Sequence, residues 1–365
     1  MIDERFLDSV RGGFIGLGAG DALGVPVETM SHEAIMAATG GSGITDYIAP
    51  KQLRVKDTLN LPPGSTSDDT QLARVTNRSL VRCRGFNLDD QGIGLVEEFE
   101  ASTFGWGGTT TEAAKAIKLW RDSGGKQGRH PAAPAPPPSK EGSSAGSGPA
   151  MKIFPLAAYC LFGRDSDKAA AMFLAHAMDL GLMTHGDPRA CIASVALGQA
   201  IAGFAAGASA DRAAIIARVE TAVAHAEAQY RFFRPYQPPF SSYLARAFAL
   251  LDDPVALRTE VNASFLAVHS IPFAIATALR HPGDFRGGVI EAVNAGKDTD
   301  TVGSMVGAML GSQVGLGGIP KQWIDGLREK DGIIADADAL CMMMHGYDPD
   351  DAKRVIAPWD RDKLH

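Results

Sequence analysis

Glycines recur at every fourth residue in two distant parts of this chain, and this pattern constrains the fold more than any other feature. The stripes are Gly16, Gly20 and Gly24, and Gly303, Gly307, Gly311 and Gly315. Residues four apart lie on one face of a helix, so each stripe leaves one face without side chains. Glycine inside a helix costs roughly 1 kcal/mol relative to alanine, and close approach of two backbones would supply a compensating gain. We therefore predict that two helices from opposite ends of the chain touch along their glycine faces.

The rest of the sequence favours an all-α fold. Helical apolar spacing continues in residues 167–178, 188–205, 211–230 and 241–251, whereas the alternation typical of strands is nearly absent. Alanine and glycine supply much of the 45% hydrophobic content, and alanine favours helices because it loses no side-chain entropy there. We expect one compact domain over residues 1–365.

A low-complexity segment interrupts the helical pattern at about residues 122–148. It is rich in Pro, Gly and Ser and includes a proline-rich run at 131–138. This composition is typical of extended and flexible chain. Because acidic motifs lie on both sides of it, we interpret the segment as a surface loop inside one domain. Residues 231–240, which contain three prolines, predict a second break between helices.

Composition excludes several classes of protein. The net charge of −7 argues against a general nucleic-acid binder, which normally has a basic face. The four cysteines are unclustered, as is usual in a reducing compartment, and no secretory signal or apolar run of about 20 residues is visible. No Ser-His-Asp order, nucleophile elbow or P-loop is present. We expect a cytoplasmic protein that does not associate with membranes.

Carboxylates gather in three motifs that lie far apart in the sequence. The motifs are Asp21 with Glu28, Ser67-Asp68-Asp69-Thr70, and Gly296-Lys297-Asp298-Thr299-Asp300-Thr301. Like charges so close repel unless a cation lies between them. Ligand sets made only of oxygen suit Mg²⁺, Mn²⁺ or Ca²⁺ rather than zinc, and this many carboxylates could hold two ions. If the glycine helices touch, the motifs converge, which indicates a metal-assisted reaction on a polar, phosphate-bearing substrate.

Each motif also has a purely structural interpretation. Ser67 and Asp298 stand where a helix N-cap with an acidic first turn is expected. A cap needs one acceptor, whereas both motifs offer two carboxylates and hydroxyls, which favours the metal interpretation. The glycine-rich stretches 105–110 and 146–152 could present N–H groups to phosphate or could be ordinary turns. Similarly, His185 could line a ligand pocket or be structural.

Together, these motifs resemble the ADP-ribosylglycohydrolase family over residues from about Arg11 to Trp323. The matching segments are Gly16-x-x-x-Gly20-Asp21-Ala22-Leu23-Gly24-x-Pro26-x-Glu28, Ser67-Asp68-Asp69-Thr70, Thr184-His185-Gly186-Asp187-Pro188 and Gly296-x-Asp298-Thr299-Asp300-Thr301. The resemblance implies an orthogonal all-α bundle that holds two Mg²⁺ ions, or Mn²⁺. It also implies cleavage of the glycosidic bond between ADP-ribose and a protein side chain, most often arginine.

The resemblance also implies roles for individual residues. The implied metal ligands are Ser67, Asp68, Asp69, Asp298, Asp300 and Thr301. The implied substrate contacts are Asp21, Gly105, Gly107, Gly108, Thr109, Gly146, Ser147, Gly148, Met151 and His185, with the 146–148 loop near the diphosphate. Asp300 and Glu28 are the candidates for the base that guides water to the anomeric carbon.

Four positions depart from the family pattern. Ser67 replaces the usual Thr and keeps the hydroxyl, and Lys297 stands where a small residue is usual. Lys152 replaces a common Arg and loses its bidentate phosphate fork. Gly105 and Gly108 stand where arginine-specific relatives tend to carry Asp and Asn, so the acceptor is the least constrained inference.

Two other classes of function remain open from the sequence. One is a catalytically degenerate protein that binds ADP-ribose or neutralises a toxin, and the other is a metal-dependent nucleotide phosphoesterase. The expected partners of the enzyme are ADP-ribosylated protein, ADP-ribose and a cognate ADP-ribosyltransferase. Release of free ADP-ribose separates the enzyme from a binder, which releases nothing, and from a phosphoesterase, which releases phosphate.

Overall fold

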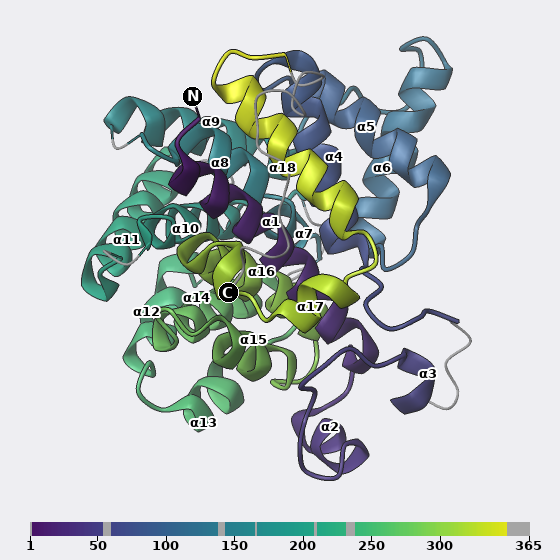
Figure 1. The fold of residues 1–365 in the computed structure, drawn as a ribbon. Coiled ribbons are helices and arrows are strands. Elements are labelled where there is room, and N and C mark those ends of the chain that lie inside the picture. Colours follow the sequence, from purple (N-terminus) through teal and green to yellow (C-terminus); the bar gives the residue numbers. More distant parts are fainter. Residues whose placement is uncertain are drawn as a thin grey trace.

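The computed structural model describes residues 2–53, 60–137, 143–164, 166–207, 210–230 and 238–348. These residues form helices and connecting turns, with no β-strand among them, which confirms the all-α prediction (Figure 1). In chain order the helices are α1 Glu4–Gly24, η1 Val25–Val27, α2 His32–Ala38, α3 Pro50–Leu53, α4 Asp68–Cys83, α5 Leu88–Ala101, α6 Gly108–Asp122, α7 Gly148–Met151, α8 Phe154–Leu161, α9 Asp167–Leu182, α10 Pro188–Phe204, α11 Arg212–Gln229, α12 Phe240–Ala249, α13 Pro254–Ala256, η3 Leu257–Val261, α14 Ala267–Arg280, α15 Phe285–Val293, α16 Thr299–Val314, η4 Leu316–Gly318, α17 Lys321–Gly326 and α18 Lys330–Met344.

Helices α1 and α16 lie side by side in the centre of the molecule, surrounded by the other helices (Figure 1). Their glycines face each other in the antiparallel order Gly12 with Gly311, Gly16 with Gly307, and Gly20 with Gly303. A Cβ added to Gly20 would lie only 1.9 Å from the carbonyl oxygen of Gly303. The predicted contact between the two stripes is thereby confirmed, and its backbones approach too closely for any side chain.

The starts of several helices follow from the residues that precede them. Asp187 accepts a hydrogen bond from the Arg189 backbone N–H, and Asp253 accepts one from Ala256, so both act as N-caps. Pro188 and Pro254 follow in the first turn, where a proline sacrifices no helical hydrogen bond. None of the described helices has the length and apolar character needed to cross a bilayer.

The described part of the segment predicted as a surface loop, 123–137 and 143–147, contains no helix but is partly packed against the core. Pro131 and Ala135 are buried, and the Ala135 N–H donates to the carbonyl of Leu182 (2.6 Å). Arg129 donates to the carbonyl of Met183 (2.6 Å) at the end of α9. The segment therefore donates hydrogen bonds to backbone carbonyls at the end of α9. Its composition does not reveal this tertiary role. Residues 138–142, and 231–237 of the second predicted break, lie outside the described residues.

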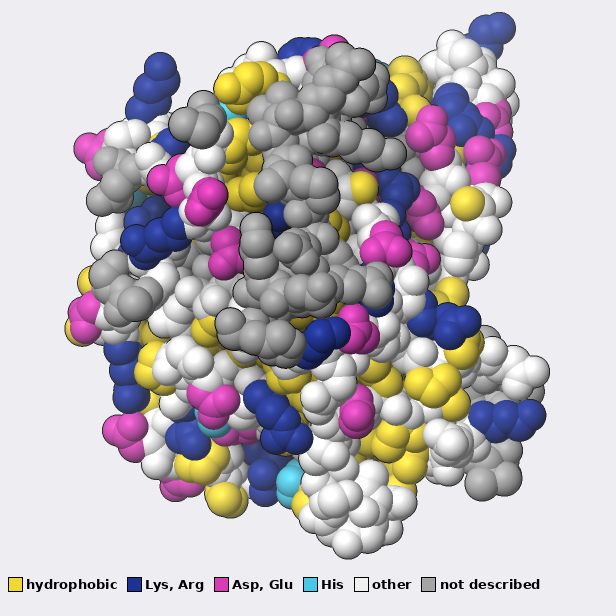
Figure 2. Space-filling model, viewed as in Figure 1, with side chains coloured by type: hydrophobic (Ala, Val, Ile, Leu, Met, Phe, Trp, Pro, Cys, Tyr) yellow, Lys and Arg dark blue, Asp and Glu magenta, His cyan; other side chains and the backbone are white. Residues whose placement is uncertain are grey.

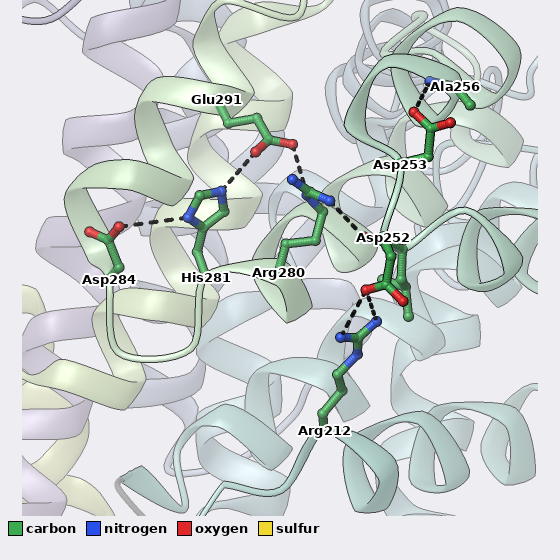
Figure 3. A network of polar contacts seen from close by, with 9 residues as sticks. Arg212, Asp252, Asp253, Ala256, Arg280, His281, Asp284 and Glu291 are labelled. Atoms are coloured by element: carbon green, nitrogen blue, oxygen red, sulfur yellow. Dashed lines mark hydrogen bonds and ion pairs between the residues drawn. The ribbon is translucent and has the colours of Figure 1, made fainter.

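A polar network ties the ends of α14 and α15 to neighbouring loops (Figure 3). Glu291 contacts His281 (2.7 Å) and Arg280 (3.3 Å), and Arg280 also donates to the carbonyl of Leu251 (2.6 Å). Burial opposes ionisation of Glu291, but its hydrogen bond with His281 and the charge of Arg280 hold its pKa below the usual value. On the face shown in Figure 2, acidic and basic side chains are interspersed.

Candidate active site

The glycine contact places Asp21 of α1 beneath the first turn of α4. Its carboxylate accepts hydrogen bonds from the backbone and hydroxyl of Ser67 (2.9 and 2.8 Å) and from the hydroxyl of Thr70 (2.5 Å). Asp21 is fully buried, and burial together with the charge of Asp300 raises its pKa to about 7. In this arrangement its oxygens orient the start of α4, and the predicted contact of Asp21 with substrate stays a prediction.

Asp69 joins α4 to α16. One of its oxygens accepts a hydrogen bond from Ser304 (2.8 Å), and the other accepts one from Thr301 (3.2 Å). The Ser67 hydroxyl lies 3.4 Å from the same carboxylate. The second and third acidic motifs therefore share one site, as the glycine stripes predict.

The 146–148 loop reaches the same cluster through Ser147. Its hydroxyl donates to Asp298 (3.2 Å), whose backbone N–H donates to Ala263 (2.9 Å). Gly146 forms an isolated β-bridge with Leu266, which fixes the loop against the start of α14. The loop thus lies against the acidic cluster, and its predicted place near a diphosphate stays a prediction.

The 105–109 loop borders the cluster from the other side. A Cβ added to Gly105 would lie 2.4 Å from the carboxylate of Asp68, and this glycine has a φ of 83°, which favours glycine. Gly107 and Gly108, by contrast, have open space around them. Gly108 and Thr109 line a cavity of about 740 Å³ that extends to Thr184.

Two further predicted substrate contacts are buried, and the candidate base Glu28 is half-buried. Met151 is buried in α7, and His185 is buried at the end of the turn that follows α9. The ring of His185 fills the space beside Gly148, where a Cβ would lie 2.6 Å from its Cε1. Glu28 is half-buried at the end of η1, close enough to raise the pKa of Asp68 and Asp298.

The cluster brings several carboxyl groups together in a buried place, where their negative charges would repel one another. Burial, reinforced by the charge of Asp300, raises the pKa of Asp68, Asp69 and Asp298 well above their usual values. The hydrogen bonds that oppose this shift come from the hydroxyls of Thr301 and Ser147 at Asp298, and from the backbone at Asp68. Bringing a cation into the cluster would relieve this repulsion, and the oxygen donors suit a hard divalent ion.

The carboxylates do not stand ready as a closed ligand set. Within the described ranges, no three His, Cys, Asp or Glu side chains are grouped tightly enough to hold a metal ion. One reason lies at Asp69, where the oxygen that is not held by Ser304 points to the hydroxyl of Thr301, another proposed ligand. Charge and donor type therefore fit a cation, whereas ligation would require these side chains to reorient.

Lys297 does not neutralise the cluster, because its side chain is exposed to solvent. Its backbone adopts a left-handed φ of 68° and pairs with Met30, whose carbonyl accepts from the Lys297 N–H (2.7 Å). Position 297 thus requires a conformation that glycine adopts most readily. This backbone requirement gives a physical reason why a small residue is usual there.

Sequence reasoning missed one residue of the site, Ser304, and the contacts of two residues that it had named, Thr70 and Lys152. Ser304 lies one turn after Thr301 on α16, so helical spacing from the acidic motif would have found it. Thr70 was visible in its motif, but its bond to Asp21 depends on the packing of α1. Lys152 contacts Thr184 (3.2 Å), and no spacing rule predicts that contact.

Comparison with known proteins gives a consistent result. The sequence profile described as ADP-ribosylglycohydrolase matches residues 2–350. The chain is 26% identical over 328 residues to the ADP-ribosyl-[dinitrogen reductase] glycohydrolase of Rhodospirillum rubrum, an alignment that covers 88% of this chain and 91% of that protein. It is 33% identical over 110 residues to ADP-ribosylhydrolase ARH3 of Mus musculus, covering 26% and 30% of the two chains. A solved structure titled ADP-ribosylglycohydrolase-related protein complex superposes with a TM-score of 0.65 at 25% identity, covering 94% of this chain and 100% of that one.

Proposed function

Because the chain belongs to the ADP-ribosylglycohydrolase family, a family of hydrolases that act on glycosyl bonds, we propose that it releases ADP-ribose from a modified protein side chain. Arginine is the acceptor that we propose first, on the strength of the family resemblance. The observation that carries the proposal is the convergence of Asp69 with Thr301, and of Asp298 with Ser147. These contacts unite the family motifs around one acidic cluster.

We propose that the cofactor is Mg²⁺, as two ions, with Mn²⁺ as the alternative. The residues that would hold it are Ser67, Asp68, Asp69, Asp298, Asp300 and Thr301. The support is a buried cluster of carboxyl groups whose ionisation calls for a neighbouring cation, together with a donor set made only of oxygen. When bound, such ions supply positive charge at the ribose hydroxyls and a water of lowered pKa.

The chain's own groups have distinct tasks in this proposal. Ser304 orients the carboxylate of Asp69 by a hydrogen bond. Ser147 links the 146–148 loop, which would lie near the diphosphate, to Asp298 by another hydrogen bond. As the bond between the anomeric carbon and the side-chain nitrogen breaks, the ribose gains oxocarbenium character and water attacks that carbon. A carboxylate oxygen of Asp300 or Glu28 accepts a proton from this water and returns a proton to the departing nitrogen. Gly107 and Gly108 have open space around them, which leaves room for the modified protein side chain on its side of the glycosidic bond.

The test is release of ADP-ribose from arginine-, serine- and nucleic-acid-linked substrates, each with chelator and then with added Mg²⁺. We expect chelation to abolish release from the arginine-linked substrate and Mg²⁺ to restore it. The double variant Asp298→Asn, Asp300→Asn should be inactive, while Asp122→Asn, an exposed aspartate on α6, should be unaffected. Full release by the double variant, or release of phosphate instead of ADP-ribose, would reject the proposal.

ADP-ribosylated protein and ADP-ribose are thus the proposed partners. A cognate ADP-ribosyltransferase and a cytoplasmic location are further proposals from the sequence. Co-purification with the inactive double variant would test ADP-ribosylated protein as a partner directly. An inactive variant retains the modified protein that the active enzyme would release.

A further inference from the structure

We propose that Lys152 and Thr184 act as positioning residues for His185, holding its ring in the tautomer that carries the proton on Nε2. In this tautomer the imidazole presents an N–H donor beside the 146–148 loop, where an anionic group such as the diphosphate of ADP-ribose would accept it. The identity of that ligand rests on the proposed function. The chain of contacts from Lys152 through Thr184 to His185, which we call the relay, is a property of the free protein.

The three side chains form a continuous buried chain. The Lys152 ammonium lies 3.2 Å from the Thr184 hydroxyl oxygen, and that oxygen lies 2.9 Å from Nδ1 of His185. All three residues are at most 3% exposed. Bulk water is therefore a poor competitor for these contacts, and the relay fixes how the groups are protonated.

Burial and the neighbouring charge of Lys152 keep the His185 imidazole neutral. Burial lowers the pKa of Lys152 to about 8, which leaves it mainly protonated at pH 7. Burial, together with the positive charge of Lys152, lowers the pKa of His185 to about 3. A neutral imidazole has one donor and one acceptor nitrogen, so the neighbours of the ring select its tautomer.

The direction of the hydrogen bonds follows from the ammonium. Lys152 can only donate, so the Thr184 oxygen accepts from it. The single hydroxyl proton of Thr184 then goes to His185 Nδ1 at 2.9 Å or to the Gly181 carbonyl at 3.3 Å. The shorter contact favours Nδ1, and an N–H group at Nδ1 would point its positive end toward the ammonium. Both arguments place the lone pair on Nδ1 and the proton on Nε2.

The free edge of the ring faces the loop. A Cβ on Gly146 would lie 3.5 Å from Nε2, and one on Gly148 would lie 3.1 Å from it. Among the described residues, no group forms a hydrogen bond with this nitrogen. Glycine at both positions leaves Nε2 unobstructed by side chains of the loop. An Nε2–H group is therefore directed to the place where the loop would hold an anion.

The first measurement is nitrogen NMR of ligand-free protein labelled at histidine, with the His185 signal assigned by its loss in His185→Gln. We expect the wild type to be protonated on Nε2, and Thr184→Val and Lys152→Met to lose this preference. Thr184→Ser and Lys152→Arg should retain it. Thr277→Val is the matched control, because Thr277 is a buried threonine whose hydroxyl has no partner among the described residues.

The second measurement is the affinity for ADP-ribose and the kinetics of its release. Thr184→Val should weaken binding and raise KM by about ten-fold, the effect of one lost hydrogen bond to a charged group, with kcat nearly unchanged. A His185 protonated on Nδ1 in the wild type overturns the relay, as does unchanged affinity in Thr184→Val. If the tautomers behave as expected while ADP-ribose is neither bound nor released, the proposed function fails and the relay stands.

Discussion

The Cα of Gly20 lies against the carbonyl of Gly303, so that a methyl group on Gly20 would overlap the backbone at 1.9 Å. Two helices from opposite ends of the chain meet at this point. Asp21 follows Gly20 directly, and α16 begins with the acidic motif that contains Asp300. The fold and the candidate site therefore depend on the same contact.

We expect Gly20→Ala to lower the free energy of unfolding by about 3 kcal/mol or more, because neither backbone can move aside without disturbing a buried helix. Urea denaturation measures this loss. Gly107→Ala is the control, since nothing lies within 4 Å of a Cβ there, and its stability should stay within about 0.5 kcal/mol of the wild type. Similar stabilities of the two variants would contradict the close helix contact.

Ser304→Ala should weaken binding of Mg²⁺ by about ten-fold, because Asp69 loses the hydrogen bond that orients its carboxylate. Calorimetric titration with Mg²⁺ gives the dissociation constant. Ser312→Ala is a matched control two turns further along α16, where the hydroxyl bonds to its own helix at Ala308. Equal Mg²⁺ affinity in Ser304→Ala and the wild type would remove Ser304 from the site.

Lys297→Gly should raise the stability of the protein by about 0.5 to 1 kcal/mol, because position 297 has a left-handed φ that costs a side chain energy. Thermal unfolding provides the measurement, with Lys297→Ala as the control that removes the charge but keeps the strain. If alanine stabilises as much as glycine, the charge rather than the backbone is responsible.

Glu291→Gln should cost about 1 kcal/mol at neutral pH, because the ion pair with Arg280 is lost and the hydrogen bond to His281 is weakened. The folded-state pKa of Glu291 is lowered from 4.5, so its stabilising effect is complete above that value and is lost as pH falls through the folded pKa. The difference between variant and wild type should therefore shrink below about pH 4.5. Asp252→Asn, an exposed partner of Arg212, should show little effect, and a difference that does not depend on pH would contradict the ion pair.

Local patterns predicted the fold and the approximate place of the site. The spacing of Gly16 and Gly20 predicted the central helix pair, and Asp187 before Pro188 predicted the start of α10, because these signals act over one or two helical turns. The family motifs predicted the class of hydrolase, and the match to the family profile confirmed it. The roles assigned to individual ligands remain predictions.

Contacts between distant segments escaped the sequence analysis. The bonds of Asp21 to Ser67 and Thr70 were not predicted, because they depend on how α1 crosses α4. Ala135 was predicted to lie in a surface loop, yet it is buried against the end of α9. In both cases the deciding partner lies far away in the sequence, where no local periodicity reports it.

The pairing of α1 with α16 has a consequence for biosynthesis. Helix α1 leaves the ribosome well before α16, with a glycine-lined, largely apolar surface whose partner has not yet been translated. Until α16 emerges, that surface has to be shielded by non-native contacts or by a chaperone. Premature termination before residue 299 would thus leave α1 unpaired and yield a product without catalytic capacity.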